Sequence, residues 1–253
     1  MKQHLARFLV GFSVLWLVAC VSDAPQRPEV NASEAANYNT QLGMNYLAQG
    51  KYDVALEKFD RAREQDPKLP DTYVGYAQLY TRLGQPELAD ENYRKAIRLA
   101  PDRGDLHNNY GVFLCGQRRL EESEEQFLLA LEDPKYTTQE FAYTNAGVCA
   151  RLVPDKDKAE NYFRKALMVN PQFGDALWQM AVLAYERNDH LKARAFLSRF
   201  HVAEQPTAES LLLGYRVETY LGDVEAAETY ATRLAARFPN SPQAKRLGEL
   251  QRQ

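Results

Sequence analysis

The sequence predicts an all-α protein built from stacked pairs of helices. Three observations carry this prediction: apolar residues recur at spacings of three, four and seven, small and aromatic residues repeat about every 34 residues, and prolines close most of the repeats. The composition suits a folded chain with a large core, because 45% of the 253 residues are hydrophobic and 26% are charged. A single helix pair cannot bury both of its apolar faces, so each pair must stack on the next.

Residues 36–69 show the repeating unit most clearly. Gly43 and Tyr46 lie on one helical face, and Ala55 and Phe59 lie on a second. The glycine and the alanine are small where two antiparallel helices must approach closely, and the aromatic side chains fill the space between the helices. This spacing resembles that of the tetratricopeptide repeat (TPR), a helix-turn-helix unit whose copies stack into a right-handed superhelical solenoid.

Six such repeats are predicted, and together they cover about four-fifths of the chain. They span residues 36–69, 70–103, 104–139, 140–173, 174–207 and 208–241. Residues 242–253 carry Leu247 and Leu250 at helical spacing. We expect them to form either a short capping helix that shields the last repeat or a frayed tail.

The first twenty residues form a different kind of segment. Lys2 and Arg7 form a basic region at the start of the chain, and an apolar run follows over residues 8–18. The last two residues of the run begin the sequence Leu-Val-Ala-Cys, which ends at Cys20. The apolar run is about half as long as a helix that spans a bilayer. We therefore expect a signal peptide over residues 1–19 rather than a permanent membrane anchor.

The Leu-Val-Ala-Cys sequence resembles a bacterial lipobox, which implies cleavage before Cys20 and its acylation by diacylglycerol and a fatty acid such as palmitate. The second residue of the mature chain would be Val21, not the aspartate that commonly retains such proteins in the inner membrane. We therefore expect the lipoprotein sorting machinery to deliver the protein to the periplasmic face of the outer membrane. The alternative is an ordinary secretory signal with a chance cysteine. Residues 20–35 are polar, carry two prolines and are predicted to form a flexible tether.

Composition and motifs favour a binding scaffold over an enzyme. Loss of the signal would change the formal charge from −3 to −5, and an acidic body without a basic stripe argues against nucleic acid as a partner. The sequence holds no HExxH motif, CxxC pair, phosphate-binding glycine loop or nucleophile elbow. His107 falls where a repeat normally has a large aromatic residue, and it is predicted to be a core histidine. We expect no catalytic residue, metal or cofactor, and a monomeric protein.

Cys115 and Cys149 are the two cysteines that remain beside Cys20. They fall near the ends of the first helices of neighbouring repeats, and export would place them in an oxidising compartment. Like helices of adjacent repeats stack side by side, so we predict a disulfide between them. The alternative is a pair of small buried hydrophobic residues.

A partner-binding groove is expected on the first helices of the repeats, which line the inner surface of TPR superhelices. The lining predicted here is largely apolar and aromatic, and it suits an extended or helical segment of another protein. The candidate residues are Met44, Leu47, Val74, Asn108, Val112, Phe141, Val148, Leu152, Trp178, Val182 and Tyr185. We expect some of these side chains to be buried against neighbouring repeats instead.

Two short segments carry a closer resemblance. The third repeat contains Asn-Asn-Tyr-Gly at residues 108–111 and Phe-Leu-Cys at residues 113–115, and the fourth contains Asn-Ala-Gly at residues 145–147 followed by Cys149. Ordinary TPR repeats do not require these asparagines or cysteines. Together with the lipobox, the proline-bearing tether and the six repeats, they resemble the type IV pilus pilotin family, also called the pilus biogenesis and stability TPR lipoproteins.

The resemblance implies a non-enzymatic protein that binds the secretin subunit of the type IV pilus. It further implies that the protein promotes the localisation and multimer assembly of the secretin in the outer membrane, which pilus biogenesis and twitching motility need. Linking the binding surface to a lipid anchor would raise the concentration of the partner at the bilayer. Two alternatives remain open: a TPR lipoprotein adaptor for another envelope-assembly or cell-wall complex, and an enzyme or regulator with a site inside the superhelix.

Overall fold

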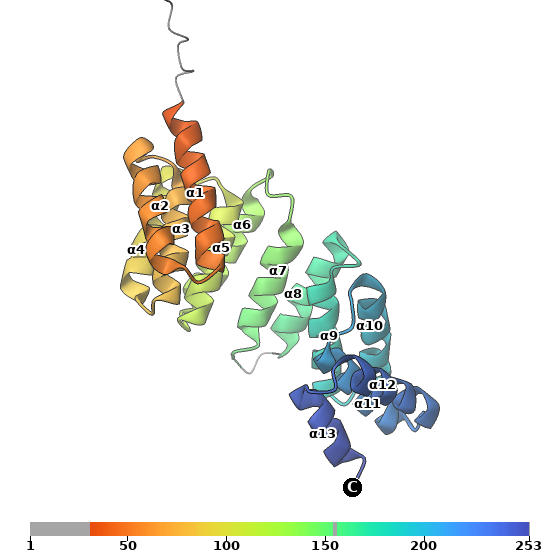
Figure 1. Cartoon of the computed structure of the whole chain (residues 1–253). Coiled ribbons are helices and arrows are strands. Elements are labelled where there is room, and N and C mark those ends of the chain that lie inside the picture. Colours follow the sequence, from red (N-terminus) through yellow and green to blue (C-terminus); the bar gives the residue numbers. More distant parts are fainter. Residues whose placement is uncertain (1–30, 154–155, 253) are drawn as a thin grey trace, which may run out of the picture. The chain divides into compact units, whose positions relative to one another are not determined.

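The computed structural model describes residues 31–153 and 156–252, and all regular structure in these ranges is helical (Figure 1). The predicted signal peptide and Cys20 lie outside the described residues. The helices are α1 (Ala32–Ala48), α2 (Tyr52–Gln65), α3 (Pro70–Arg82), α4 (Pro86–Leu99), α5 (Gly104–Gly116), α6 (Leu120–Glu132), α7 (Gln139–Ala150), α8 (Lys156–Val169), α9 (Gly174–Glu186), α10 (His190–Ala203), α11 (Ala208–Leu221), α12 (Val224–Arg237) and α13 (Pro242–Leu250). None of them is both long enough and apolar enough to cross a membrane.

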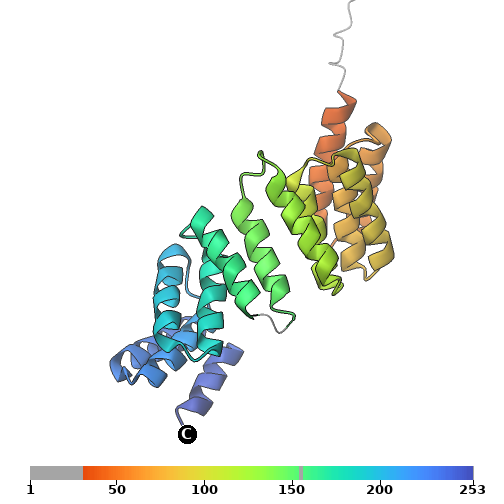
Figure 2. The same cartoon turned by 180° about the vertical axis from the view of Figure 1, so that it is seen from behind.

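The helices α1 to α12 form six antiparallel pairs, one in each predicted repeat (Figures 1 and 2). The two helices of a pair contact each other, and each first helix also contacts the first helix of the next repeat. Odd-numbered helices therefore form one continuous layer from α1 to α11. The structure confirms the prediction of an all-α TPR solenoid.

Close packing within the first, third and fourth pairs depends on glycine opposite phenylalanine. A Cβ atom added at Gly43 in α1 would lie 2.5 Å from the ring of Phe59 in α2, and Gly147 in α7 faces Phe163 in α8 at the same distance. Both rings are fully buried. Any side chain at these glycines would have to displace a ring from a densely packed core. The glycines of the repeat pattern are therefore required by the packing of the two helices.

The first helix begins earlier than the sequence predicts. Helix α1 starts at Ala32, so the expectation of a tether over residues 20–35 is wrong for its last four residues. Alanine and glutamate favour helix here, and Glu34 lies in the first turn, where the positive end of the helix dipole stabilises a carboxylate. Ala36 is completely buried against Ala62 and Leu69, which fixes this end of the helix on the repeat.

The last repeat is covered by α13. The Ser241 hydroxyl caps this helix by accepting a hydrogen bond from the backbone N–H of Ala244, at 3.1 Å. Leu247 is 4% exposed and packs in a cluster with Leu211 and Leu234. Of the two alternatives for residues 242–253, the structure contains the capping helix, over residues 242–250.

Candidate functional site

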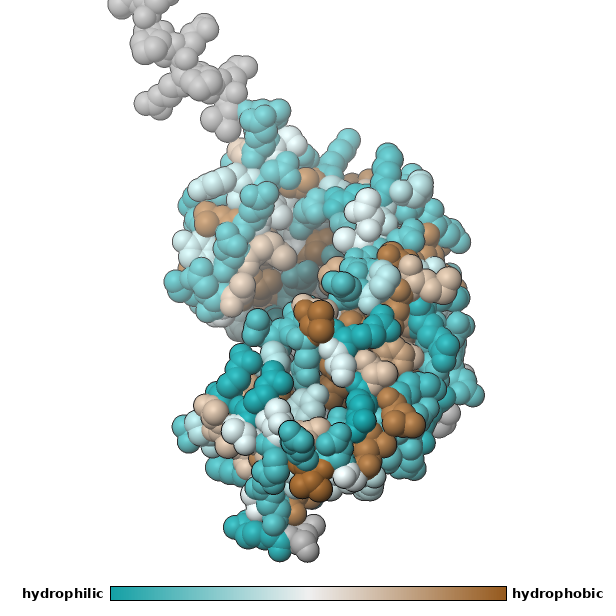
Figure 3. All heavy atoms as spheres, turned by 90° about the vertical axis from the view of Figure 1, so that its right-hand side faces the viewer, coloured by the Kyte–Doolittle hydropathy of each residue, from teal (hydrophilic) through white to brown (hydrophobic). Residues whose placement is uncertain are grey.

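The first helices of repeats one to three surround a polar hollow of about 630 Å³. We call it the amide hollow, because side-chain carboxamides dominate its lining. Helix α1 contributes Asn37, Thr40, Gln41, Met44 and Asn45, helix α3 contributes Asp71, Val74 and Gln78, and helix α5 contributes Asn109. A hollowed area of the molecular surface, with hydrophobic side chains set among hydrophilic ones, is visible in Figure 3.

Four carboxamides of the amide hollow have no hydrogen-bond partner among the described residues. They belong to Gln41, Asn45, Gln78 and Asn109. Asn37 differs, because its side chain donates to the backbone carbonyl of Ser33, at 2.9 Å. Each unpaired carboxamide offers both a donor and an acceptor. The hollow therefore presents several hydrogen-bonding groups of both kinds to a ligand.

The amide hollow has no positively charged residue in its lining. Asp71 is the one ionisable residue in its lining, and Arg103 donates two hydrogen bonds to the Asp71 carboxylate, at 2.7 and 3.0 Å. Hydrogen bonds to Asp71, and then to Asp105, raise the pKa of Arg103, so the guanidinium stays charged. The Asp71 carboxylate is therefore paired, with Arg103 shared between Asp71 and Asp105, and the other lining residues that a ligand meets are uncharged.

A second surface lies next to the hollow, on α5 and α7. We call it the apolar stripe, and it consists of Val112, Phe141, Val148 and Leu152, which are between 38% and 47% exposed. The last three are seven and four residues apart, so they lie on one face of α7 and of the turn after it. A run of large apolar side chains exposed to this degree is typical of a protein-binding surface.

Two asparagines connect α5 to α7. The side-chain amide of Asn145 donates a hydrogen bond to the side-chain oxygen Oδ1 of Asn108, at 3.0 Å. These are the asparagines that the sequence marks as unusual for a TPR repeat. Asn108 is next in the chain to Asn109 of the amide hollow, and it lies one helical turn from Val112 of the apolar stripe. The pair therefore joins the two surfaces.

The structure also joins α5 to α7 by a disulfide between Cys115 and Cys149, whose Cα atoms are 5.7 Å apart.

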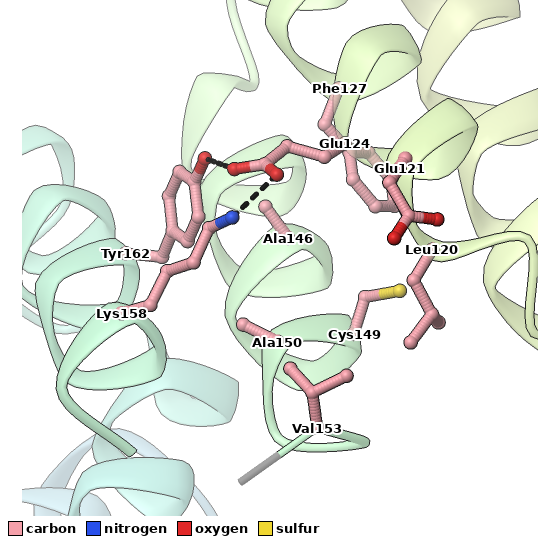
Figure 4. Close-up of a pocket in the computed structure, with 10 residues that line it drawn as sticks. All are labelled: Leu120, Glu121, Glu124, Phe127, Ala146, Cys149, Ala150, Val153, Lys158 and Tyr162. Atoms are coloured by element: carbon pink, nitrogen blue, oxygen red, sulfur yellow. Dashed lines mark hydrogen bonds and ion pairs between the residues drawn. The ribbon is translucent and has the colours of Figure 1, made fainter. Parts of the chain in front are cut away.

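Cys149 borders a small pocket of about 110 Å³ between α6, α7 and α8 (Figure 4). Glu124 closes one side of this pocket by accepting hydrogen bonds from the Lys158 ammonium and the Tyr162 hydroxyl, both at 2.5 Å. Burial, and then the bond to Glu124, raise the pKa of Tyr162. This pocket is too small for a peptide, and its polar groups tie α6 to α8.

The predicted groove residues fall into three groups. Met44 and Val74 lie in the amide hollow, and the four residues of the stripe and Asn108 lie beside it. Leu47 is 9% exposed and belongs to the core between the first two repeats, so the expectation that it lines the groove is wrong. Close packing of α1 on α3 buries it. The remaining predicted groove residues, Trp178, Val182 and Tyr185, are half-buried in the core around α9.

Sequence reasoning missed the carboxamides of Gln41, Asn45 and Asn109 as binding residues, whereas the TPR register places Gln78 on the inner surface. A signal for two of the four exists, because Gln41 and Asn109 occupy the same place in their repeats as Asn145 and Gln179. A carboxamide that recurs with the period of the solenoid forms a row on one layer of helices.

His107 is a core residue, as the sequence predicts. It is 7% exposed, and its ring nitrogens make hydrogen bonds of 2.8 Å with Gln126 and with the backbone carbonyl of Pro101. Within residues 31–153 and 156–252, no group of histidine, cysteine, aspartate and glutamate side chains is arranged to hold a metal ion.

Comparison with known proteins agrees with the repeats. The tetratricopeptide repeat family matches residues 33–102 in one form, and residues 74–137 and 155–208 in another. The helix pairs and these matches define a TPR repeat protein, a scaffold class that presents surfaces to partners.

Individual relatives of the chain show to which family of TPR proteins it belongs. The type IV pilus assembly protein PilF of Pseudomonas aeruginosa is 31% identical over 236 residues, which are 92% of this chain and 94% of the relative. A crystal structure of PilW, described as a widely conserved type IV pilus biogenesis factor, superposes with a TM-score of 0.74 at 32% identity, covering 84% of this chain and 97% of that one. A structure of Pseudomonas aeruginosa PilF gives the same TM-score at 30% identity, covering 87% and 99%. The chain belongs to the PilF/PilW family of TPR proteins of type IV pilus biogenesis.

Proposed function

We propose that this protein is an outer-membrane lipoprotein pilotin. In this proposal it binds the secretin subunit of the type IV pilus and promotes the localisation and multimer assembly of that subunit in the outer membrane. The observation that carries the proposal is the half-exposed apolar stripe on α5 and α7, in a chain of the PilF/PilW family.

The apolar stripe supports binding of a protein segment. Fully burying a valine, leucine or phenylalanine side chain contributes about 1.5 to 3 kcal/mol, so covering four half-exposed ones contributes roughly 1 kcal/mol each. This gain offsets part of the entropy that a partner loses on binding. The neighbouring disulfide and the Asn108–Asn145 hydrogen bond hold α5 and α7 together, so the stripe is formed before the partner arrives.

Acylation of Cys20 would supply the membrane attachment. Each buried methylene of an acyl chain contributes about 0.8 kcal/mol, and several chains on one residue give stable anchoring. A partner held on the repeats would then be concentrated at the bilayer without any new contact. Export through the same signal would place Cys115 and Cys149 where disulfides persist.

A deletion strain tests the proposal. The strain is complemented with the native chain or with Cys20→Ala, and secretin multimers that resist SDS are scored in separated inner and outer membranes. We expect outer-membrane multimers to be lost on deletion, restored by the native chain, and not restored to the outer membrane by Cys20→Ala. Normal multimers in every strain would contradict the proposal and would favour an adaptor for another envelope complex.

A further inference from the structure

The amide hollow suits different chemical groups of a ligand than the apolar stripe does. We propose that it binds the main chain of an extended segment of the partner protein through the carboxamides of Gln41, Asn45, Gln78 and Asn109. This inference rests on the proposed function, because it describes how part of the secretin subunit is held. It adds the conformation of the bound segment and the atoms that recognise it.

The unpaired carboxamides match a peptide main chain. A peptide unit carries one N–H donor and one C=O acceptor, and a side-chain carboxamide can pair with both. A helical segment satisfies these groups internally, so it has little use for a row of carboxamides. An extended segment leaves its N–H and C=O groups open along its length. The lining therefore favours an extended ligand over a helical one.

The spacing of the helices fits a short peptide. Packed helices lie about 8–10 Å apart, so the distance from α1 across α3 to α5 is roughly 16–20 Å. An extended chain rises about 3.3 Å per residue, and five or six residues would cross the hollow. Thr40 and Val74 are buried in the lining and Met44 is partly buried, so they give the side chains of the segment a mainly apolar floor.

The segment can continue from the hollow onto the apolar stripe. Helix α5 contributes Asn109 to the hollow and Val112 to the stripe, and these residues are one helical turn apart. A peptide that passes α5 would therefore place its main chain on carboxamides first and its apolar side chains on α7 afterwards. Main-chain bonds give affinity with little sequence preference, and the stripe selects the sequence.

Charge and lining chemistry argue against other ligands. An anion or a free carboxylate needs positive charge, and no lysine or arginine lines the hollow; Arg103, which bonds to Asp71 of the lining, also pairs with Asp105. A sugar chain is normally held against aromatic rings, and no aromatic residue lines the hollow.

Peptides derived from the proposed partner test the inference. The protein used is a soluble form starting at residue 21, which retains the compact unit of residues 32–253 that contains every described helix. Overlapping 12-residue peptides that tile the secretin subunit are screened by fluorescence anisotropy. The tightest peptide is then synthesised with a single N-methyl group at each position in turn, which removes one N–H and leaves the side chains unchanged.

Two variants test the protein side. We expect Gln78→Ala and Asn109→Ala each to weaken the peptide by roughly three- to tenfold, the cost of losing a neutral hydrogen bond. Asn92→Ala on α4 is the matched control, because the Asn92 amide bonds only to the Leu88 carbonyl of its own helix, and we expect it to bind like the native protein. N-methylation at two or more positions should weaken binding by a similar factor. Thermal unfolding of each variant verifies that the fold is intact.

The outcomes separate this inference from the proposed function. If the secretin subunit and a tiled peptide bind, but neither N-methylation nor the two carboxamide variants change the affinity, the extended main-chain mode is wrong and the proposed function stands. Binding of the intact subunit without binding of any tiled peptide would also overturn the mode. Absence of binding by the intact subunit would overturn the proposed function and this inference together.

Discussion

The amide hollow and the apolar stripe lie on the same layer of first helices and yet differ in chemistry. The hollow presents neutral carboxamides over a buried floor, whereas the stripe presents half-exposed valine, leucine and phenylalanine side chains. Because a TPR solenoid repeats one backbone arrangement, the difference comes from the side chains at equivalent places. One solenoid can therefore recognise the main chain of a partner on α1, α3 and α5 and the side chains of that partner on α5 and α7.

The largest effect is expected from breaking the disulfide that lies beside the boundary between the two surfaces. Closing a loop of 34 residues stabilises a protein by about 3 to 4 kcal/mol on the chain-entropy model, so Cys115→Ala should lower the free energy of unfolding by that amount. Urea unfolding of both proteins, with and without reductant, measures it. Reductant should lower the stability of the native protein to that of the variant.

The oxidation state itself is checked by mass spectrometry of the unreduced protein after alkylation. Two alkylated thiols at positions 115 and 149 in protein purified from the periplasm would contradict the disulfide. If the hollow and the stripe act as one surface, loss of the bridge should also weaken the binding of a segment that spans both.

Acid should lower stability without changing the two surfaces. Burial, and then the charge of Arg233, lower the pKa of His201 to about 4, below its usual value near 6.5. The unfolded chain therefore binds more protons between these values, and the folded state loses stability as the pH falls from about 6.5 to about 4. We expect a loss of about 1 to 2 kcal/mol between pH 7 and pH 5, allowing for the partial exposure of the ring.

The matched variant is His201→Gln, which can still hydrogen-bond to the Ser210 hydroxyl but does not titrate in this range. Thermal melts across this pH range should show a smaller decrease for the variant. Affinity for a bound peptide should stay constant between pH 6 and 8, because no histidine lines the hollow and the stripe is apolar. An equal decrease in both proteins would show that other groups cause the acid effect.

The smallest effect on stability is expected from a substitution at Arg118, in the turn between α5 and α6. Arg118 adopts a φ of 59°, in the left-handed region, where three other repeats have Gly50, Gly84 and Gly222 with φ between 68° and 76°. Arg118→Gly removes the strain of a Cβ in this conformation but adds freedom to the unfolded chain, so we expect a gain of about 0.5 kcal/mol. Chemical denaturation measures the gain, and peptide affinity should not change. A loss of stability would mean that the arginine side chain makes a favourable contribution that exceeds the strain.

The fold could be predicted because its steric rules are local. The pairing of Gly43 with Phe59 recurs at Gly147 and Phe163, and such a match between a glycine and a ring is visible in the sequence at a fixed spacing. The start of α1 was harder to predict, because residues 32–35 precede the repeat pattern and their helix depends on propensity and on burial of the next turn.

The candidate site could be predicted only in part. Sequence placed Leu47 and Val148 on first helices alike, but exposure depends on how closely neighbouring helices pack, and only the structure shows that the leucine is buried and the valine is not. The carboxamides of Gln41 and Asn109 were missed because polar side chains are common on helix surfaces. Only the structure shows that they lack partners and lie around one hollow.

The binding surface is tested most directly by two valine substitutions of the same kind. Val148→Glu places a charge on the apolar stripe, and Val202→Glu places the same charge on the second helix α10, where the side chain is 82% exposed. The measurement is the affinity of each soluble protein for the purified secretin subunit, with circular dichroism as the check of folding. We expect Val148→Glu to bind at least tenfold more weakly and Val202→Glu to bind like the native protein. Equal affinity of all three would contradict the assignment of the binding surface to α5 and α7.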